Sequence, residues 1–389
     1  MLDVTLNHED FASAATWVGS FIPTKAPVGA VRGMKLHATQ DGLHLTAFDY
    51  ETSATTTVAA QVDGEGEIVV PGKLCTQIAA NCPHAPVRIT ASDTTCRIHA
   101  GAARFETPLI PLEDYPALPE TPPQSGEIDA TEFSTAIRQV TLAASREDTI
   151  PMLMAVQLHI DANHLTLECT DRFRLATRTI SWSPATSPAE PVSVYLPAKT
   201  LATLARSFQD EPNDTVQIQM AGTCEEDGDR VGISLGSRHT TLRILDVNFP
   251  QTSQLFPEKH THAAIVDTEE LAAAIRRVAA VSTEPRPQIV CRFSGNQLHI
   301  TTSTSEGNAG QETLGCQFSS GTEFTLTVAR NYLLDGLTAT NSPQVAMWFT
   351  RPNQPVIITP ATGEETLSGD GLTRPATDAA YMVMPMRTP

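Results

Sequence analysis

The chain contains the segment VQLHIDANHLTLECTD at residues 156–171, in which apolar and polar side chains alternate on both sides of a polar turn. Alternation with a period of two is typical of strands that bury one face. Two further segments have the same form, MKLHATQDGLHLTAFD at 34–49 and VCRFSGNQLHITTST at 290–304. The sequence therefore predicts three antiparallel hairpins spread along the chain.

Each predicted hairpin follows a predicted amphipathic helix with a polar residue at its start. Asp129 and Asp267 are the predicted N-caps of two helices, and Glu132 and Glu270 follow them by three residues. This pattern satisfies the free N–H groups of a first helical turn. Asn7 is the predicted N-cap of the first helix, whose pattern is less regular than those of the other two. Apolar residues then recur at i, i+4 and i+7 and form one stripe on each helix: Phe11, Ala15 and Val18; Phe133, Ile137 and Val140; and Leu271, Ile275 and Val278.

A strand and a second helix follow each hairpin, at residues 68–82, 194–208 and 326–340. Pro71 and Pro197 stand near two of these helix starts, where proline is tolerated. Matched positions lie 122–126 residues apart between the first and second segments, and 132–138 between the second and third. The same order of elements thus recurs three times along the chain.

We predict an α+β fold of three tandem repeats, each with two helices and about eight strands. The predicted domains are residues 1–124, 125–258 and 259–389, with linkers in the Pro-rich stretch 116–127 and the polar stretch 257–262. Chance similarity among unrelated α+β domains is the alternative. The agreement in element order along each whole repeat argues against it.

The composition limits the class of protein. The formal net charge is −18 and the pI is about 5.0, which argues against a general nucleic-acid binder because phosphates attract positive surfaces. The seven cysteines include no CxxC pair, so we expect neither a disulfide framework nor a zinc site. The N-terminus lacks the basic and apolar regions of a signal peptide, and no run of 18 apolar residues is present. We therefore expect a cytoplasmic protein with no membrane segment.

No catalytic motif is found in the sequence. GxxxxGK[ST], GxGxxG, HExxH and GxSxG are all absent. His260 and His262 are the only close pair of histidines. They lie in a predicted linker, where a solvated pair is expected and a metal site is the alternative. The acidic run EEDGD at 225–229 lacks the spacing of a calcium loop and indicates a hairpin tip. We expect a non-catalytic protein without a cofactor or metal ion.

The chain resembles the bacterial DNA polymerase III β subunit family, the sliding clamps, over nearly its whole length. The most specific segments are DTIPMLMAVQLHI (148–160), CTDRFRLATR (169–178), NYLLDGL (331–337) and AAYMVMPMR (379–387). The resemblance implies a ring-shaped homodimer of six domains, with twelve helices facing a central hole and sheets outside. It also implies that the ring encircles double-stranded DNA without sequence choice. The implied partners are the DNA polymerase III catalytic subunit, the clamp loader, and other polymerases and repair proteins that carry clamp-binding peptides.

A clamp needs positive charge on the helices that face its hole, because phosphate contacts position a protein without reading bases. The candidates on or beside the predicted helices are Lys25, Lys73, Arg138, Arg146, Lys199, Arg206, Arg276 and Arg277. Solvated helix faces are the alternative role for these residues. Acidic residues concentrate in predicted outer loops such as 63–67 and 225–229. A net acidic chain can therefore present a locally positive hole.

The resemblance also implies a peptide-binding pocket between the second and third domains. Carried over by motif, its residues are Leu153, Thr170, Arg172, Phe173, Arg174, Leu175, Pro250, Gln254, Leu255, Tyr332, Met382, Val383, Met384, Pro385, Met386 and Arg387. Methionine and aliphatic side chains make an adaptable apolar groove, while Arg174 and Arg387 are candidates to bind peptide carbonyls or carboxylates. The apolar tail YMVMPM could instead be an edge strand that completes the third domain, and both roles are compatible.

Several positions depart from the family pattern. Gln254 stands where many relatives have a basic residue, and segment 303–314 is less strand-like than its counterparts. The predicted dimer interface pairs Phe105 and Thr107 with Ala280 and Val281 of the other subunit, and Thr107 is a weak choice where the family uses apolar side chains. The chain is thus a housekeeping clamp or a second, variant clamp, for example an inhibitor-resistant one. A protein-binding adaptor that does not bind DNA is the alternative from another class.

Overall fold

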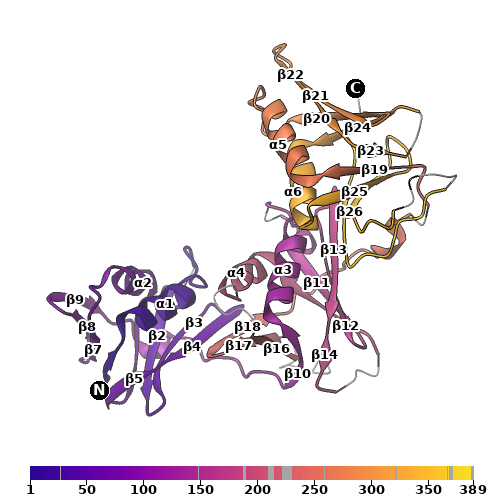
Figure 1. The fold of residues 1–389 in the computed structure, drawn as a ribbon. Coiled ribbons are helices and arrows are strands. Elements are labelled where there is room, and N and C mark those ends of the chain that lie inside the picture. Colours follow the sequence, from indigo (N-terminus) through magenta and orange to yellow (C-terminus); the bar gives the residue numbers. More distant parts are fainter. Residues whose placement is uncertain are drawn as a thin grey trace. The chain divides into compact units, whose positions relative to one another are not determined.

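The structure is a computed structural model that describes residues 1–26, 28–147, 149–186, 190–208, 214–220, 230–257, 259–319, 322–365, 367 and 371–386 (Figure 1). Within these residues each repeat has the same order of elements: a strand, a helix, five strands, a second helix and three strands. This confirms the threefold repeat. The structure has nine strands per repeat where about eight were predicted, and β14 and β23 are only two residues long.

The first repeat contains β1 (Asp3–Leu6), α1 (His8–Gly19), β2 (Gly33–Thr39), β3 (Gly42–Phe48), β4 (Thr52–Val58), β5 (Ala60–Gly64), β6 (Gly66–Pro71), α2 (Gly72–Asn81), β7 (Val87–Ala91), β8 (Thr95–Ala100) and β9 (Ala103–Pro108). The second contains β10 (Gln124–Asp129), α3 (Ala130–Thr141), β11 (Ala155–Asp161), β12 (His164–Thr170), β13 (Arg174–Ser181), β14 (Ser183–Pro184), β15 (Val192–Pro197), α4 (Ala198–Ser207), β16 (Thr215–Met220), β17 (Arg230–Leu235) and β18 (Arg238–Arg243). The third contains β19 (His262–Asp267), α5 (Thr268–Ala279), β20 (Gln288–Ser294), β21 (Gln297–Ser303), β22 (Ala309–Gly315), β23 (Gln317–Phe318), β24 (Phe324–Ala329), α6 (Arg330–Thr340), β25 (Gln344–Phe349), β26 (Val356–Pro360) and β27 (Ala379–Val383).

The predicted caps and stripes of the first helix in each repeat are confirmed. Asn7 accepts hydrogen bonds from the N–H groups of Glu9 and Asp10 at the start of α1. Asp129 accepts from the N–H of Glu132 at 2.8 Å, and Asp267 accepts from that of Glu270 at 2.9 Å. All nine stripe residues predicted on α1, α3 and α5 are buried. The sequence therefore sets both the start and the buried face of these helices.

The chain divides into two compact units, and the division passes through the second repeat. One unit comprises Met1–Phe133, Trp182–Ser187 and Arg206–Ile244, and the other comprises Ser134–Ser181, Pro188–Ala205 and Leu245–Pro389. Each unit holds one nine-stranded sheet. The order in the first is β14-β10-β16-β17-β18-β4-β3-β2-β6, and in the second it is β15-β11-β12-β13-β27-β26-β25-β19-β23. Strands of the second repeat thus enter both sheets, once beside the first repeat and once beside the third (Figure 1).

Each unit also has a smaller sheet that contains strands of one repeat only. The first repeat forms the five-stranded sheet β5-β1-β7-β8-β9, and the third forms the four-stranded sheet β22-β21-β20-β24. Segment 303–314 was expected to be less strand-like, and this was wrong for its second half. Residues 309–315 form β22, which pairs with β21 from Gln297↔Gly315 to Ser303↔Ala309. Exposed and half-buried residues alternate along β22, so its sequence lacks the apolar signal of an inner strand.

Within the described part of the chain, no helix is long and apolar enough to cross a membrane. Nor do those residues contain a group of three or more His, Cys, Asp or Glu side chains placed to hold a metal ion. The hairpin tip predicted at 225–229 lies outside the described residues.

His260 corrects the expectation of a solvated histidine pair in the linker. The side chain is only 1% exposed, its ring lies 5.5 Å from that of Trp348, and neither ring nitrogen has a hydrogen-bond partner among the described residues. Its backbone N–H donates to the carbonyl of Leu372 at 2.8 Å. Burial, together with the charge of Arg374, lowers the pKa of His260 to about 4. His262 opens β19, and its ring stacks on Phe318 at 5.8 Å.

A buried neutral histidine makes stability depend on pH. In the unfolded chain the imidazole has its ordinary pKa near 6.5, so between about pH 6.5 and 4 the unfolded state binds a proton more readily than the folded state. The contribution of the neutral His260 to the free energy of unfolding is therefore fully present above this pH range and falls as the pH is lowered through it. We expect a change from pH 7 to pH 5 to remove about 2 kcal/mol through His260.

The test compares the free energy of unfolding at these two pH values in the wild type and in His260→Leu. The variant should lose this part of the pH dependence, whatever its absolute stability. His164→Gln removes an exposed histidine from the start of β12 and should retain the dependence. An unchanged difference between the two pH values in His260→Leu would contradict this role of His260.

Candidate functional site

The turn between β12 and β13 carries the sequence TDRFR and is fixed by its own side chains. The Asp171 carboxylate accepts hydrogen bonds from the N–H groups of Phe173 and Arg174 at 2.9 and 3.0 Å. The Thr170 hydroxyl donates to the carbonyl of Arg174 at 2.7 Å and accepts from the N–H of Arg172 at 3.1 Å. Arg172 has a φ of 76°, in the left-handed region that favours glycine. The turn leaves the side chains of Arg172 and Phe173 exposed.

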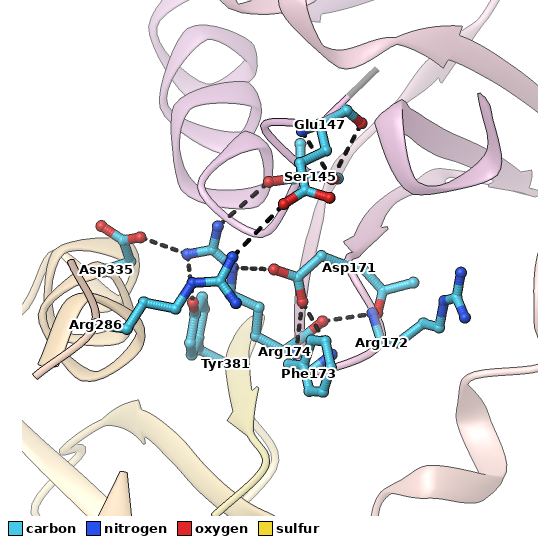
Figure 2. A network of polar contacts seen from close by, with 11 residues as sticks. Ser145, Glu147, Asp171, Arg172, Phe173, Arg174, Arg286, Asp335 and Tyr381 are labelled. Atoms are coloured by element: carbon cyan, nitrogen blue, oxygen red, sulfur yellow. Dashed lines mark hydrogen bonds and ion pairs between the residues drawn. The ribbon is translucent and has the colours of Figure 1, made fainter. Parts of the chain in front are cut away.

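Arg174 enters a buried polar network instead (Figure 2). Its Nε donates to Asp171 at 2.9 Å, and its terminal nitrogens donate to Asp335, to the Tyr381 hydroxyl at 3.5 Å and to the Ala144 carbonyl at 3.3 Å. Burial acts to lower the pKa of Arg174, but Tyr381, Asp171 and Asp335 raise it above its ordinary value. The side chain is 4% exposed. We assign Arg174 to the frame that joins the turn, α6 and β27 rather than to direct binding of a ligand carboxylate.

A cavity of about 480 Å³ is lined by this turn, by the loop after α3 and by the start of α6. Phe173 and Tyr332 stack within it, with ring centroids 6.4 Å apart and 21° between the ring planes. The guanidinium carbon of Arg174 lies 4.6 Å from the centroid of the Tyr332 ring. Among the sequence-predicted pocket residues, Leu153, Arg172, Phe173, Arg174 and Tyr332 are brought together here.

Charged residues that the sequence did not predict also line the cavity. Glu147 and Arg286 form an exposed ion pair at 3.7 Å, and Asp335 accepts from Arg174. Asp335 lies in the NYLLDGL segment one helical turn after Tyr332, so its helical spacing could have indicated that both residues share a face. Nothing in the sequence marks Arg286, which lies in the loop after α5.

The C-terminal segment forms β27, an interior strand between β13 and β26 rather than an edge strand. Met382 is buried, while the Met384 N–H donates to the carbonyl of Phe173 at 2.7 Å. The Met386 N–H donates to the carbonyl of Thr327 at 2.8 Å. The tail is therefore part of the fold up to Met386 and borders the TDRFR turn.

The other predicted pocket residues do not line the cavity. Thr170, Leu175, Met382 and Val383 are buried, Pro250, Gln254, Leu255 and Met384 are exposed, Pro385 and Met386 are half-buried, and Arg387 lies outside the described residues. Leu175 and Met382 share one apolar cluster with Trp348 and Leu372, and Phe256 packs against it. The segment that carries Gln254 and Leu255 thus joins directly to the core between β13 and β27.

The first repeat contains the same turn between β3 and β4. Asp49 accepts hydrogen bonds from the N–H groups of Glu51 and Thr52 at 3.1 and 2.7 Å, as Asp171 does in the second repeat. Tyr50 has a φ of 73°, close to the 76° of Arg172. The two turns therefore share one backbone conformation and differ in their side chains.

The difference lies in what the side chains contact. At the turn of the first repeat, Arg230 from the second repeat donates to the carbonyls of Tyr50 and Glu51 at 2.6 and 3.2 Å, and Arg243, also from the second repeat, forms an ion pair with Glu51 at 3.3 Å. In the second repeat Phe173 replaces that ion-paired glutamate and is 56% exposed. Tyr50 of the first turn is also exposed, at 51%, so the two turns differ in the arginines of β17 and β18 that contact the first turn.

Three family models match the chain in succession. They describe the DNA polymerase III beta subunit: its N-terminal domain over residues 2–119, its central domain over 127–251 and its C-terminal domain over 253–368. The chain belongs to the DNA polymerase III beta subunit family. It is therefore a DNA sliding clamp, a non-catalytic processivity factor of DNA replication.

Relatives of the clamp cover it from end to end. The beta sliding clamp of Streptomyces coelicolor is 31% identical over 99% of both chains, and the beta sliding clamp homolog GriR of Streptomyces muensis is 28% identical over 98% of both. The fold matches the solved beta subunit of Thermotoga maritima at 20% identity, with a TM-score of 0.86 and 100% of both chains covered. It also matches the Pseudomonas aeruginosa clamp bound to griselimycin at 22% identity, with a TM-score of 0.86 and 100% of both chains covered.

The eight basic residues predicted to face DNA are all exposed in the clamp. Six lie on helices, namely Lys73 on α2, Arg138 on α3, Lys199 and Arg206 on α4, and Arg276 and Arg277 on α5, while Lys25 and Arg146 lie in the loops after α1 and α3. Arg277 is held by Glu312 of β22, with contacts of 3.0 and 2.5 Å. Of the two neighbouring arginines on α5, Arg277 is thus bound to a carboxylate, and no such contact is found for Arg276 among the described residues.

The predicted interface residues lie on or beside the two single-repeat sheets. Phe105, half-buried, and Thr107, 3% exposed, belong to β9. Ala280 and Val281 follow α5, where Ala280 is exposed and Val281 is half-buried. Thr107 is buried within its own subunit, where its hydroxyl donates to the carbonyl of Pro108 at 3.4 Å.

Removal of the Asp335 charge should destabilise the clamp, because it leaves the buried Arg174 with one carboxylate in place of two. We expect Asp335→Asn to lower the free energy of unfolding by about 2–3 kcal/mol, measured by urea denaturation. Glu147→Gln removes a carboxylate from an exposed ion pair of the same cavity and should cost less than about 0.5 kcal/mol. Equal losses in the two variants would show that the buried network does not hold the site.

Proposed function

We propose that two copies of this clamp close into a ring around double-stranded DNA, and that the strand pairing between repeats carries this function. Within the chain, β18, the last strand of the second repeat, pairs with β4 of the first. In the same way β27, the last strand of the third repeat, pairs with β13 of the second. The equivalent strands left over are β9 and β22, and each forms one edge of its sheet.

The strand numbers support the same conclusion. Each pairing between repeats joins four strands of one repeat to five of another to make nine. The unpaired sheets have five and four strands, so β9 and β22 of two different chains would complete further nine-stranded sheets. Exposed sheet edges are normally protected, and mutual pairing is one way to cover both. Two chains closed in this way form a homodimeric ring of six repeats, a closed and symmetric assembly.

The predicted interface residues fit this edge pairing. Phe105 and Thr107 belong to β9, and Ala280 and Val281 follow α5, which packs on β22. We propose that the ring contacts DNA through the eight exposed basic residues of its helices and the adjoining loops, by phosphate contacts that do not read sequence. The domain boundaries proposed are 124/125 and 258/259, and the proposed location is the cytoplasm.

The cavity beside the TDRFR turn is proposed as the docking site for peptides of partner proteins. The partners proposed are the DNA polymerase III catalytic subunit, the clamp loader, and other polymerases and repair proteins with clamp-binding peptides. The exposed Phe173, the apolar cluster under Leu175 and Met382, and a griselimycin complex of a structurally similar clamp support this site. Tethering raises the effective concentration of a polymerase at DNA, so one weak peptide contact is sufficient.

A variant clamp is the second candidate, favoured by the likeness to GriR at 28% identity and by Gln254 where many relatives carry a basic residue. Binding of griselimycin separates the two candidates, since a housekeeping clamp should bind it as the Pseudomonas aeruginosa clamp does. A protein-binding adaptor that does not contact DNA is distinguished from both candidates because it should not be retained on DNA.

Loading on nicked circular DNA tests the ring directly. The clamp should remain on the circle after loading and should leave once the circle is cut, because only a closed ring is retained by topology. Val281→Arg places a charge at the proposed subunit interface and should give a protein of single-chain mass that is lost from both DNA forms. Equal loss of the wild type from circular and linear DNA would overturn the ring.

A truncated clamp tests the docking site. A chain that ends at Val383 retains β27 but lacks the contacts of Met384 with the Phe173 carbonyl and of Met386 with the Thr327 carbonyl. We expect it to fold and dimerise with at least tenfold weaker binding of partner peptides, measured by fluorescence anisotropy. Affinity equal to that of the full chain would mean that the docking site lies elsewhere.

A further inference from the structure

Arg172 and Arg146 are the two arginines of the TDRFR turn cavity whose exposed side chains have no partner among the described residues. Among those residues, no hydrogen bond or ion pair of the Arg172 guanidinium is found, and in Figure 2 its side chain extends away from the polar network. Its backbone is nonetheless held at φ 76° by the Thr170 hydroxyl. A residue other than glycine at this φ stores strain, which is often found where the side chain serves a function.

The other charges of the cavity, apart from that of Arg146, are already engaged. Asp171 and Asp335 both accept from Arg174, and Glu147 is paired with Arg286. Four arginines and three acidic residues line the cavity, so one positive charge is in excess although the whole chain carries −18. The two exposed arginines outside these pairs are Arg172 and Arg146, and only Arg172 directly precedes the exposed Phe173 in the TDRFR turn.

We propose that Arg172 selects, among peptides that dock at this site, those that carry a carboxylate beside their apolar residues. This inference rests on the peptide-docking function proposed above and goes beyond it to the chemistry of the ligand. Phe173 supplies the apolar contact, and the free guanidinium of Arg172 presents a planar fork of N–H donors that matches a carboxylate. Arg174 cannot do this, since its guanidinium is buried and bound to two carboxylates of the clamp itself.

The first repeat supports this division of roles. At the matching turn position it carries Tyr50, which has no charge, beside a glutamate that is ion-paired to Arg243. Of these two turns, which share a backbone conformation at φ 73° and 76°, the second has an unpaired cation at this position, directly before an exposed apolar residue. Selection of acidic peptides is therefore tied to one turn of the chain.

Short fluorescent peptides built on Leu and Phe test the proposal. Each peptide with Asn at a polar position is compared with its partner that has Asp there, and each polar position is tested in turn by anisotropy with the full-length clamp. For at least one position we expect the Asp peptide to bind the wild type about threefold to fivefold more tightly, as for an exposed ion pair. This preference should decline as salt is added, because exposed charges are screened.

Two alanine variants assign the preference to a residue. Arg172→Ala should bind the Asn peptide as the wild type does and should lose the preference for Asp. Arg292→Ala removes the same charge from β20 of the third repeat and should retain the preference. An Asp-to-Asn ratio in Arg172→Ala equal to that of the wild type overturns the inference, as does a wild type without preference at any position. If no peptide of either kind binds the wild type, the docking function fails as well.

Arg172→Gly tests whether the strained backbone is kept for this side chain. Glycine tolerates the left-handed conformation, so this variant should unfold at a higher temperature than Arg172→Ala while it loses the preference for Asp in the same way. A lower unfolding temperature for Arg172→Gly than for Arg172→Ala would contradict the strain on which the proposal depends.

Discussion

Antiparallel pairing between the last strand of one repeat and the fourth strand of the repeat before it is the interaction on which this clamp depends. It occurs at β18 with β4 and at β27 with β13, and it makes continuous nine-stranded sheets out of separate repeats. Backbone hydrogen bonds do not depend on side-chain identity, so three repeats with little sequence in common can all use the same pairing. Within one chain, β9 and β22 each lack a neighbouring strand from another repeat. In the proposed ring, a second chain supplies that strand.

The repeats are alike in backbone and different in surface chemistry, and we propose that this difference gives each chain one docking site. Asp49 and Asp171 fix the same turn in two repeats, yet one turn carries Glu51, which pairs with Arg243, while the other has the exposed Phe173 at that position. The buried Arg174 network ties the second turn to α6 and β27, so the site is assembled from segments of the second and third repeats. The positions that break the repeat are thus the positions proposed to bind partners.

Periodicity and capping residues were sufficient to predict the hairpins, the first helix of each repeat and their order, because these signals are local. They failed at β22, whose exposed and half-buried residues lack an apolar pattern, and at His260, whose burial depends on Trp348 far along the chain. The pocket residues came from resemblance to a family and not from spacing. Asp335 lies 161 residues from Arg174, so no local signal could reveal that the two side chains meet. Whether a predicted arginine is free, as Arg172 is, or buried, as Arg174 is, likewise depends on the tertiary fold.

Hydrogen exchange of the backbone amides in β9 and β22 tests the central claim most directly. In the assembled clamp the amides at both edges should be protected, and dilution or Val281→Arg should remove that protection from both strands together. The amides that pair β18 with β4 and β27 with β13 should remain protected throughout, because those pairings lie within one chain. Exchange at β9 and β22 that is equally fast in the assembled and dissociated protein would contradict the claim that these two edges close the ring.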